Sequence, residues 1–379
     1  MSDGTTGLVF DERYLGHDTG VEATVSMRDG SFTLPPEPHP SALFITQRIK
    51  HFLDGSGLTG QMHPIPVRAA TEVELAQYHT REYIAGIKTL TEGGPIHGSW
   101  GAAELDTPLS KGSFEAALYA AGGAMNAVSA VMEGTVRNAY ALLRPPGHHA
   151  MKNRAMGYCI FGNAVMAAHH ARKVYGLDRV LIVDWDVHHG NGTQDAFFQD
   201  PNVLFISLHQ HNWYPKLSGE LEQVGSGQGA GYTVNIPLPA GTGDRGYIAA
   251  FEQIVLPIGY LYQPQLVIIS AGQDASWLDP LAQMLVSMDG FRQMSEMMVK
   301  FAEEVCAGRL VMLQEGGYSA PYTPYCTVAA VEPLMGADLG IIDLYAGSSE
   351  LDRSQTIFTG ETREALYAAR RWHNGWWKI

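Results

Sequence analysis

Short apolar runs that end in glycine or in charged residues recur along the chain and predict strands. Five of them are clear, at 139–143, 180–184, 203–207, 265–274 and 310–318, and weaker runs lie at 8–10 and 233–238. A short, partly β-branched apolar run ahead of a turn is typical of a buried strand. Because helical segments separate most of these runs, they predict an α/β fold in which right-handed crossovers form a parallel sheet with helices on both faces.

Apolar residues spaced three and four apart predict the helices between these strands. The segment 42–54 shows this spacing and stops at Gly55. Further helices are predicted at 71–78, 79–90, 110–133, 163–175, 195–198, 246–262 and 288–306. The segments 11–40, 93–108 and 225–231 are rich in glycine, proline or polar residues and predict loops.

Length and composition narrow the class of protein. An α/β chain of 379 residues is often one unit, so we expect a single domain over 1–379. Lys and Arg number 25 against 39 Asp and Glu, a net charge of −14, which disfavours nucleic acid as a partner and is compatible with cationic substrates. Three cysteines without a C-x-x-C pair fit a reducing cytoplasm. The first residues do not resemble a signal peptide and no long apolar run suggests a membrane span, so we expect a cytoplasmic protein.

The stretch LIVDWDVHHGNGTQ, at 181–194, carries the densest chemistry. Asp184, Asp186 and His188 are two apart, so in an extended segment their side chains project from one face. Carboxylates with one imidazole suit zinc or a similar divalent ion, and three protein ligands leave one position open. The alternative is a capped strand end with solvated carboxylates.

Three other predicted strands also end in unusual chemistry. His148 and His149 follow one strand, Asp274 ends another, and Tyr318 ends the last. Ligands bind at the carboxyl ends of strands in open α/β sheets, so these termini should line one crevice. Asp274 then supplies a third metal ligand, a histidine can deprotonate the attacking water, and Tyr318 can donate to a developing oxyanion. The pattern predicts metal-assisted hydrolysis of a carbonyl compound.

Five ordered motifs resemble the zinc-dependent histone deacetylase superfamily, closest to class II and its bacterial amidohydrolases. They are RPPGHHA, DWDVHHGNGT, SLHQH, GQDAS with LDP, and EGGYS, and the resemblance covers roughly 40–332. It implies an arginase-like α/β fold around an eight-stranded parallel sheet. It also implies that one Zn²⁺ per chain serves to remove acetyl or related acyl groups from Nε-acyl-lysine-type amides.

The resemblance assigns roles residue by residue. It implies zinc on Asp186, His188 and Asp274, His149 as general base and then acid, His148 paired with Asp184, and Tyr318 as the transition-state tyrosine. It implies a structural K⁺ held by Asp184, Asp186, His188, Ser207 and Leu208, and a second K⁺ held by Phe197, Asp200, Val203 and Tyr232. The acyl-lysine tunnel should be walled by Gly157, Tyr158 and Tyr214.

The sequence departs from the family pattern at these walls, where both aromatic residues are usually Phe and here are Tyr, which leaves the acyl-chain preference open. Asn191 stands where class I members carry an Asp beside the catalytic histidine, and Asn is the class II pattern. A neutral partner should raise the pKa of His149 less than a carboxylate would.

Other functions compete with acyl-lysine hydrolysis. An acetylpolyamine deacetylase shares every motif, but a polyamine-selective relative has Glu after the D-P pair, where this chain has Leu281. A silent acyl-lysine-binding protein would be favoured by loss of the tyrosine, yet Tyr318 is present. A dimanganese ureohydrolase would need further D-x-D carboxylates. The substrate is therefore expected to be an acylated lysine peptide or a small acylated amine.

The C-terminal tail RWHNGWWKI could cover the edge of the core or form a subunit contact. We expect a homo-oligomer, either a dimer or a tetramer.

Overall fold

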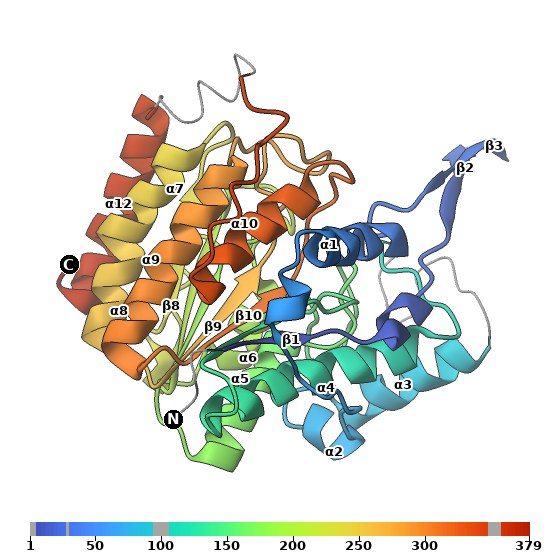
Figure 1. Cartoon of the computed structure of the whole chain (residues 1–379), viewed down its shortest axis with the longest axis horizontal. Coiled ribbons are helices and arrows are strands. Elements are labelled where there is room, and N and C mark those ends of the chain that lie inside the picture. Colours follow the sequence, from blue (N-terminus) through green and yellow to red (C-terminus); the bar gives the residue numbers. More distant parts are fainter. Residues whose placement is uncertain (1–4, 28–29, 94–105, 348–357) are drawn as a thin grey trace.

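The computed structural model, which describes residues 5–27, 30–93, 106–347 and 358–379, is built around one eight-stranded sheet (Figure 1). All neighbouring strands in this sheet run parallel, which confirms the predicted sheet. The strand order is β4-β1-β5-β10-β9-β6-β7-β8. The bounds are β1 Thr6–Val9, β4 His63–Pro64, β5 Asn138–Ala141, β6 Val180–Asp184, β7 Val203–Gln210, β8 Thr233–Leu238, β9 Leu266–Ala271 and β10 Leu310–Gln314.

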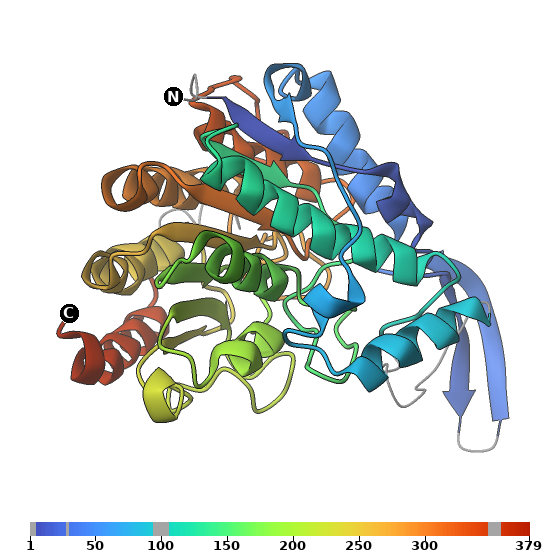
Figure 2. The same cartoon turned by 90° about the horizontal axis from the view of Figure 1, so that it is seen from below.

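Helices cover both faces of the sheet (Figure 2). The alternation of strand side chains between the two faces explains why. Val180 and Ile182 belong to one buried cluster, whereas Leu181 and Val183 belong to the other. The first cluster is completed by α2 Glu72–Leu75, α3 Arg81–Glu92, α4 Ser113–Met132 and α5 Asn163–Tyr175. The second is completed by α1 Leu43–Gly55, α7 Asp244–Ala250, α8 Leu256–Tyr262, α9 Met288–Cys306, α10 Thr323–Met335 and α12 Gly360–Trp377.

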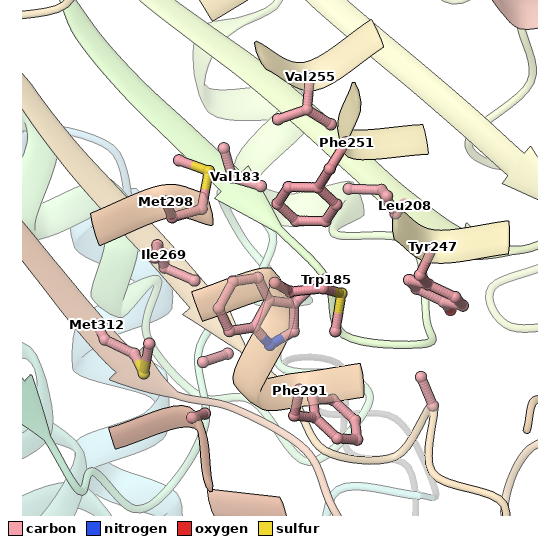
Figure 3. Packing of buried hydrophobic residues seen from close by; sticks show 14 of the residues in the cluster. Val183, Trp185, Leu208, Tyr247, Phe251, Val255, Ile269, Phe291, Met298 and Met312 are labelled. Carbon is pink, nitrogen blue, oxygen red and sulfur yellow. The ribbon is translucent and has the colours of Figure 1, made fainter. Parts of the chain in front are cut away.

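The larger core lies directly beneath the DWDVH stretch. Trp185 is fully buried and packs beside Phe251, Phe291 and Tyr247 (Figure 3). Val187 joins the same cluster. Trp185 and Val187, which alternate with the acidic residues and His188, therefore anchor this stretch in the apolar core.

Most predicted helices are confirmed, with differences at their ends. The helix predicted at 195–198 is α6, Asn191–Phe197, which begins four residues earlier than predicted. The helix predicted at 246–262 is α7 and α8 joined by the π-helical turn η4, Phe251–Val255. The glycine-rich segment at 225–231 is a loop that contains the single 3-10 turn η3, Gly227–Gly229. Residues 94–105 of the predicted loop at 93–108 lie outside the described residues.

The prediction of a long loop at 11–40 is wrong. The segment contains the 3-10 turn η1, Glu12–Gly16, and an antiparallel pair, β2 Val21–Met27 and β3 Gly30–Pro38, which projects from the body of the molecule (Figure 1). Proline is depleted in central strands because it cannot donate to the ladder. In a two-stranded ribbon both strands are edges, so prolines at 35, 36 and 38 are compatible with it.

The C-terminal helix α12 packs against β8, where the indole N–H of Trp377 donates to the carbonyl oxygen of Gly231 at 2.8 Å. Trp372 and Trp376 are exposed on it. The tail thus covers this edge of the sheet, where the ring of Trp376 also lies close to Gly231. Its role in a subunit contact stays a prediction. Among the described residues, no helix has the length and apolar character needed to cross a membrane.

Candidate active site

The three predicted metal ligands converge at the carboxyl ends of two neighbouring strands. Asp186 and His188 follow β6, and Asp274 follows β9. Their ligand atoms all lie within 4.8 Å of one another, and all three residues are buried. Nδ1 of His188 lies 3.1 Å from Oδ1 of Asp186 and 3.1 Å from Oδ2 of Asp274.

Backbone groups hold both carboxylates in place. The N–H of Val187 donates to Oδ1 of Asp274 at 2.9 Å, and the N–H of Gly316 donates to Oδ2 of Asp186 at 2.8 Å. A Cβ at Gly316 would lie 2.2 Å from Oδ2 of Asp274. Only glycine therefore lets the end of β10 come this close to the carboxylates.

The charge distribution of this cluster suits a cation. Burial lowers the pKa of His188, but the hydrogen bonds and charges of Asp186 and Asp274 outweigh burial and raise that pKa to about 10. The site therefore stabilises positive charge where these side chains meet. Two carboxylates and one imidazole are a donor set that zinc accepts, with a further position left for water or substrate. The residues present fit a single divalent ion.

The paired histidines occupy two different electrostatic environments. Nδ1 of His148 lies 3.1 Å from Oδ2 of Asp184, whereas Nδ1 of His149 lies 2.7 Å from Oδ1 of Asn191. Burial lowers the pKa of His148, but Asp186 and Asp184 raise it well above its usual value. Burial, together with the charges of His148 and His188, lowers the pKa of His149 well below its usual value. These surroundings therefore favour the charged form of His148 and the neutral form of His149.

Tyr318 is held by its backbone next to the metal ligands. Its N–H donates to Oδ2 of Asp279 at 2.7 Å, and Oδ1 of Asp279 accepts from the N–H of Leu281 at 2.9 Å. Burial and the charges of Asp274 and Asp186 raise the pKa of Tyr318 well above its usual value. The phenol therefore stays protonated and can donate a hydrogen bond.

Part of this arrangement lines a tunnel of about 380 Å³ that opens to solvent. Its lining includes all four predicted substrate-binding residues, Gly157, Tyr158, Tyr214 and Leu281, together with His149, His188 and Tyr318. Asp106, Trp213 and Lys216 also line it. Sequence reasoning missed these three because no motif marks them, and only the fold brings them to the tunnel.

The comparisons with known proteins agree with this geometry. The histone deacetylase domain matches residues 39–334. The chain belongs to the histone deacetylase family. The histone deacetylase-like amidohydrolase of Pseudomonas aeruginosa is 38% identical to it over 363 residues, which are 95% of this chain and 94% of that protein. The polyamine deacetylase HDAC10 of Danio rerio is 36% identical over 287 residues, which are 74% of this chain and 42% of that protein.

The crystal structure of the HDA15 HD domain matches the deacetylase fold of this chain. The TM-score is 0.84 at 35% identity, and the match covers 99% of this chain and 95% of that domain. With the eight-stranded parallel sheet, this match confirms the predicted arginase-like deacetylase fold. The family and its relatives make the chain a hydrolytic enzyme of the deacetylase and amidohydrolase type.

The first potassium set predicted for this deacetylase shares Asp186 and His188 with the metal cluster, and its Asp184 pairs in register with Ser207 across β6 and β7. Leu208 follows on β7. In the second set, the carboxylate of Asp200 is ion-paired with Arg172, so a side chain of the protein already neutralises it. Phe197, Val203 and Tyr232 complete that set around the start of β7. Both potassium sites stay predictions.

Glu315 is a further buried carboxyl group that sequence reasoning left without a role. Its Oε2 accepts from the N–H groups of Gly147 and His148 at 2.6 and 3.2 Å, and its Oε1 accepts from Ser270 at 3.2 Å. Together with His148 and Cys159 it has the spacing of a metal site. Since the group already hydrogen-bonds to the histidine turn, it holds that turn in position. The EGGYS motif was the signal that could have found it.

Proposed function

We propose that this chain is a zinc-dependent amidohydrolase that removes acetyl or related acyl groups from Nε-acyl-lysine-type amides. The observation that carries the proposal is the arrangement of a three-ligand metal cluster whose His188 lines one tunnel together with His149 and Tyr318. The lowered pKa of His149 and the raised pKa of Tyr318 suit a base and a hydrogen-bond donor. Membership of the histone deacetylase family supports the same reaction class.

Asp186, His188 and Asp274 would hold one zinc ion. When bound, zinc supplies Lewis-acid chemistry, which polarises a carbonyl group and lowers the pKa of water. The surrounding chain orients these ligands, since backbone N–H groups bind both carboxylates.

His149 is the general base in this proposal. Its Nδ1–H donates a hydrogen bond to Oδ1 of Asn191, so Nε2 carries no hydrogen and can accept a proton from the attacking water. His149 then returns that proton to the leaving nitrogen. His148 stays protonated beside Asp184 and stabilises negative charge as the reaction proceeds.

The hydroxyl of Tyr318 donates a hydrogen bond to the substrate oxygen that becomes negative in the transition state. The rings of Tyr158 and Tyr214 wall the space through which the acylated side chain enters, and the ring of Tyr158 lies edge-on to Tyr318 with centroids 5.5 Å apart. The walls exclude water from the methylene chain and present its amide to the base and the tyrosine.

The remaining features of the proposal concern the whole protein. Residues 1–379 form a single catalytic domain, which coverage of 99% of the chain by one structural match supports. We also propose two structural potassium ions, a dimer or tetramer, and a cytoplasmic location without nucleic-acid or membrane partners. The net charge of −14 supports the absence of nucleic acid.

A second candidate function is hydrolysis of acetylated polyamines. The carboxylate of Asp106 at the tunnel favours a cationic substrate, and the relative from Danio rerio is named a polyamine deacetylase. Lys216 lines the same tunnel and would repel a second ammonium group, and Leu281 offers apolar contact instead of charge. These two residues favour acyl-lysine peptides.

The test is a panel of acetyl-lysine peptides, longer acyl-lysine peptides and acetylspermidine-type amines, assayed on zinc-loaded protein. We expect the highest kcat/KM on an acyl-lysine peptide. Tyr318→Phe should lower kcat by about 10²-fold or more, the usual cost of one oxyanion donor, while bound zinc stays at the wild-type level. Higher kcat/KM on the polyamine would favour the second candidate. Zinc-loaded wild type without activity on any substrate would favour a silent acyl-lysine-binding protein.

A further inference from the structure

The carboxylate of Asp106 joins the two opposite walls of the tunnel. Its Oδ1 accepts from the hydroxyl of Thr107 at 2.8 Å and from the N–H of Gly157 at 3.3 Å. Thr107 in turn accepts from the N–H of Tyr158 at 3.0 Å. Oδ2 of Asp106 accepts from the hydroxyl of Tyr214 at 2.9 Å. One oxygen therefore serves the wall formed by 157–158, and the other serves the wall formed by Tyr214.

The ring of Tyr214 determines how much space remains beside the reacting groups. It lies edge-on to His149 and to His188, with centroids 5.1 and 6.0 Å apart. A Cβ at Gly157 would lie 2.2 Å from Cδ2 of His149 and 3.0 Å from Cε1 of Tyr214. A methyl group does not fit at Gly157, so the backbone of this wall lies close against the rings of Tyr214 and His149.

The loop that carries Tyr214 is tied to the tunnel rim at a second point. The indole N–H of Trp213 donates to the carbonyl oxygen of Leu281 at 2.7 Å. Neighbouring side chains of one loop therefore bind two different rim segments. A phenylalanine at 214 would present the same apolar ring to a substrate, so the hydroxyl is explained by its bond to Asp106 and not by the wall itself.

We propose that the Tyr214–Asp106 hydrogen bond is a specificity-determining clasp that fixes the width of the tunnel. With the clasp closed, the tunnel accepts the unbranched methylene chain of an acyl-lysine and disfavours acylated amines with a wider linker. Because the acceptor is a carboxylate, the bond is stronger than one between neutral groups. The inference rests on the proposed function and adds the shape of amine that the site selects.

Two acetylated peptides of matched sequence test the clasp. One carries acetyl-lysine, and the other carries N-acetyl-4-(aminomethyl)phenylalanine, which has an aromatic ring in the linker. In Tyr214→Phe, kcat/KM for the wide substrate relative to acetyl-lysine should rise by about fivefold, the effect of losing one hydrogen bond. The rise should come mainly from a lower KM for the wide substrate.

A matched control and a second variant separate the clasp from a general loss of structure. Tyr260→Phe removes another tyrosine–carboxylate bond, to Glu304 on the surface, and should leave the ratio unchanged. Asp106→Ala breaks the bond to Tyr214 together with those to Thr107 and Gly157, so it should raise the ratio at least as much as Tyr214→Phe does. Adding Tyr214→Phe to Asp106→Ala should have no further effect, because the bond between these two residues is already lost. Asp106→Asn keeps an acceptor and should shift the ratio less than Asp106→Ala. Zinc content and the thermal midpoint are measured on each variant, so that any variant that does not fold is recognised.

The outcomes distinguish the clasp from the proposed function. An unchanged ratio in Tyr214→Phe, or an equal rise on adding Tyr214→Phe to Asp106→Ala, would overturn the clasp and leave the proposed function intact. Zinc-loaded wild type that hydrolyses neither peptide would overturn the proposed function itself.

Discussion

Two adjacent histidines of identical chemistry have pKa values shifted in opposite directions because their neighbours differ. His148 faces the carboxylates of Asp184 and Asp186, whereas His149 faces the amide of Asn191 and the imidazole of His188. An opposite charge favours the ionised form of an imidazole, and burial without one favours the neutral form. The partner residue therefore decides which histidine can act as a base.

This contrast predicts the effect of Asn191→Asp. A carboxylate beside Nδ1 raises the pKa of His149, so the base stays protonated to a higher pH. The acid limb of the kcat/KM profile should therefore move to higher pH, and activity should fall more at pH 6 than at pH 8. The measurement is kcat/KM against pH for wild type and variant. Asn374→Asp adds the same charge at an exposed position of α12, a helix that contributes no residue to the site, and should leave the profile unchanged.

Sequence could locate the residues that follow predicted strands, but not those that reach the site through tertiary contacts. His149, Asp186 and Tyr318 belong to motifs at strand ends, which a parallel sheet must bring to one edge. Asp106 lies in a glycine- and proline-rich segment, and its hydrogen bonds reach residues 51 and 108 positions away along the chain. No local pattern encodes contacts of that range.

At the scale of elements, parallel strands were predictable because burial on both faces gives them continuous apolar runs. The pair β2 and β3 was not predictable, since it lies outside the eight-stranded sheet and its glycine and prolines are typical of a loop. The two-residue strand β4, His63–Pro64, is too short to show any periodicity. Its place at the sheet edge follows from pairing with β1.

The turn after β10 gives an element-scale prediction for Gly316→Ala. The added methyl group would lie 2.2 Å from Oδ2 of Asp274 and 2.6 Å from Oδ2 of Asp186, so one carboxylate or the turn must move. Displacing the groups that orient metal ligands typically costs 10- to 100-fold in affinity, so we expect zinc binding to weaken by at least about tenfold. Competition with a chelating dye measures this directly.

Gly375→Ala in α12 is the matched control, because a Cβ there meets no atom within 4 Å. It should leave zinc affinity unchanged, and its stability should match or slightly exceed that of wild type because Ala favours helix over Gly. Equal zinc affinity in Gly316→Ala and wild type would contradict the close approach of this turn to the carboxylates.

At the scale of the whole molecule, the sheet concentrates buried ionisable groups in one place. Asp184, Asp186 and Asp274 have no solvent exposure, and burial raises the pKa of Asp184 and of Asp274 to about 6. Uncompensated buried charge destabilises a folded chain, and a bound cation relieves it. Metal occupancy and global stability should therefore be linked.

This linkage predicts that the thermal midpoint depends on free zinc. A ligand that binds only the folded state stabilises it by about 1.4 kcal/mol for each tenfold excess over its Kd. For 379 residues the unfolding entropy is about 0.8 kcal/mol/K, so each tenfold rise in free zinc should raise the midpoint by roughly 1.7 °C. Chelation should lower the midpoint and abolish activity, and added zinc should restore both. Calorimetry at buffered zinc concentrations measures the slope of the midpoint against the logarithm of free zinc.

In Asp274→Ala this slope should vanish over the same range, because a charged ligand is lost from a three-ligand site. A midpoint insensitive to zinc in the wild type, or a full slope in this variant, would contradict a single site built on these residues.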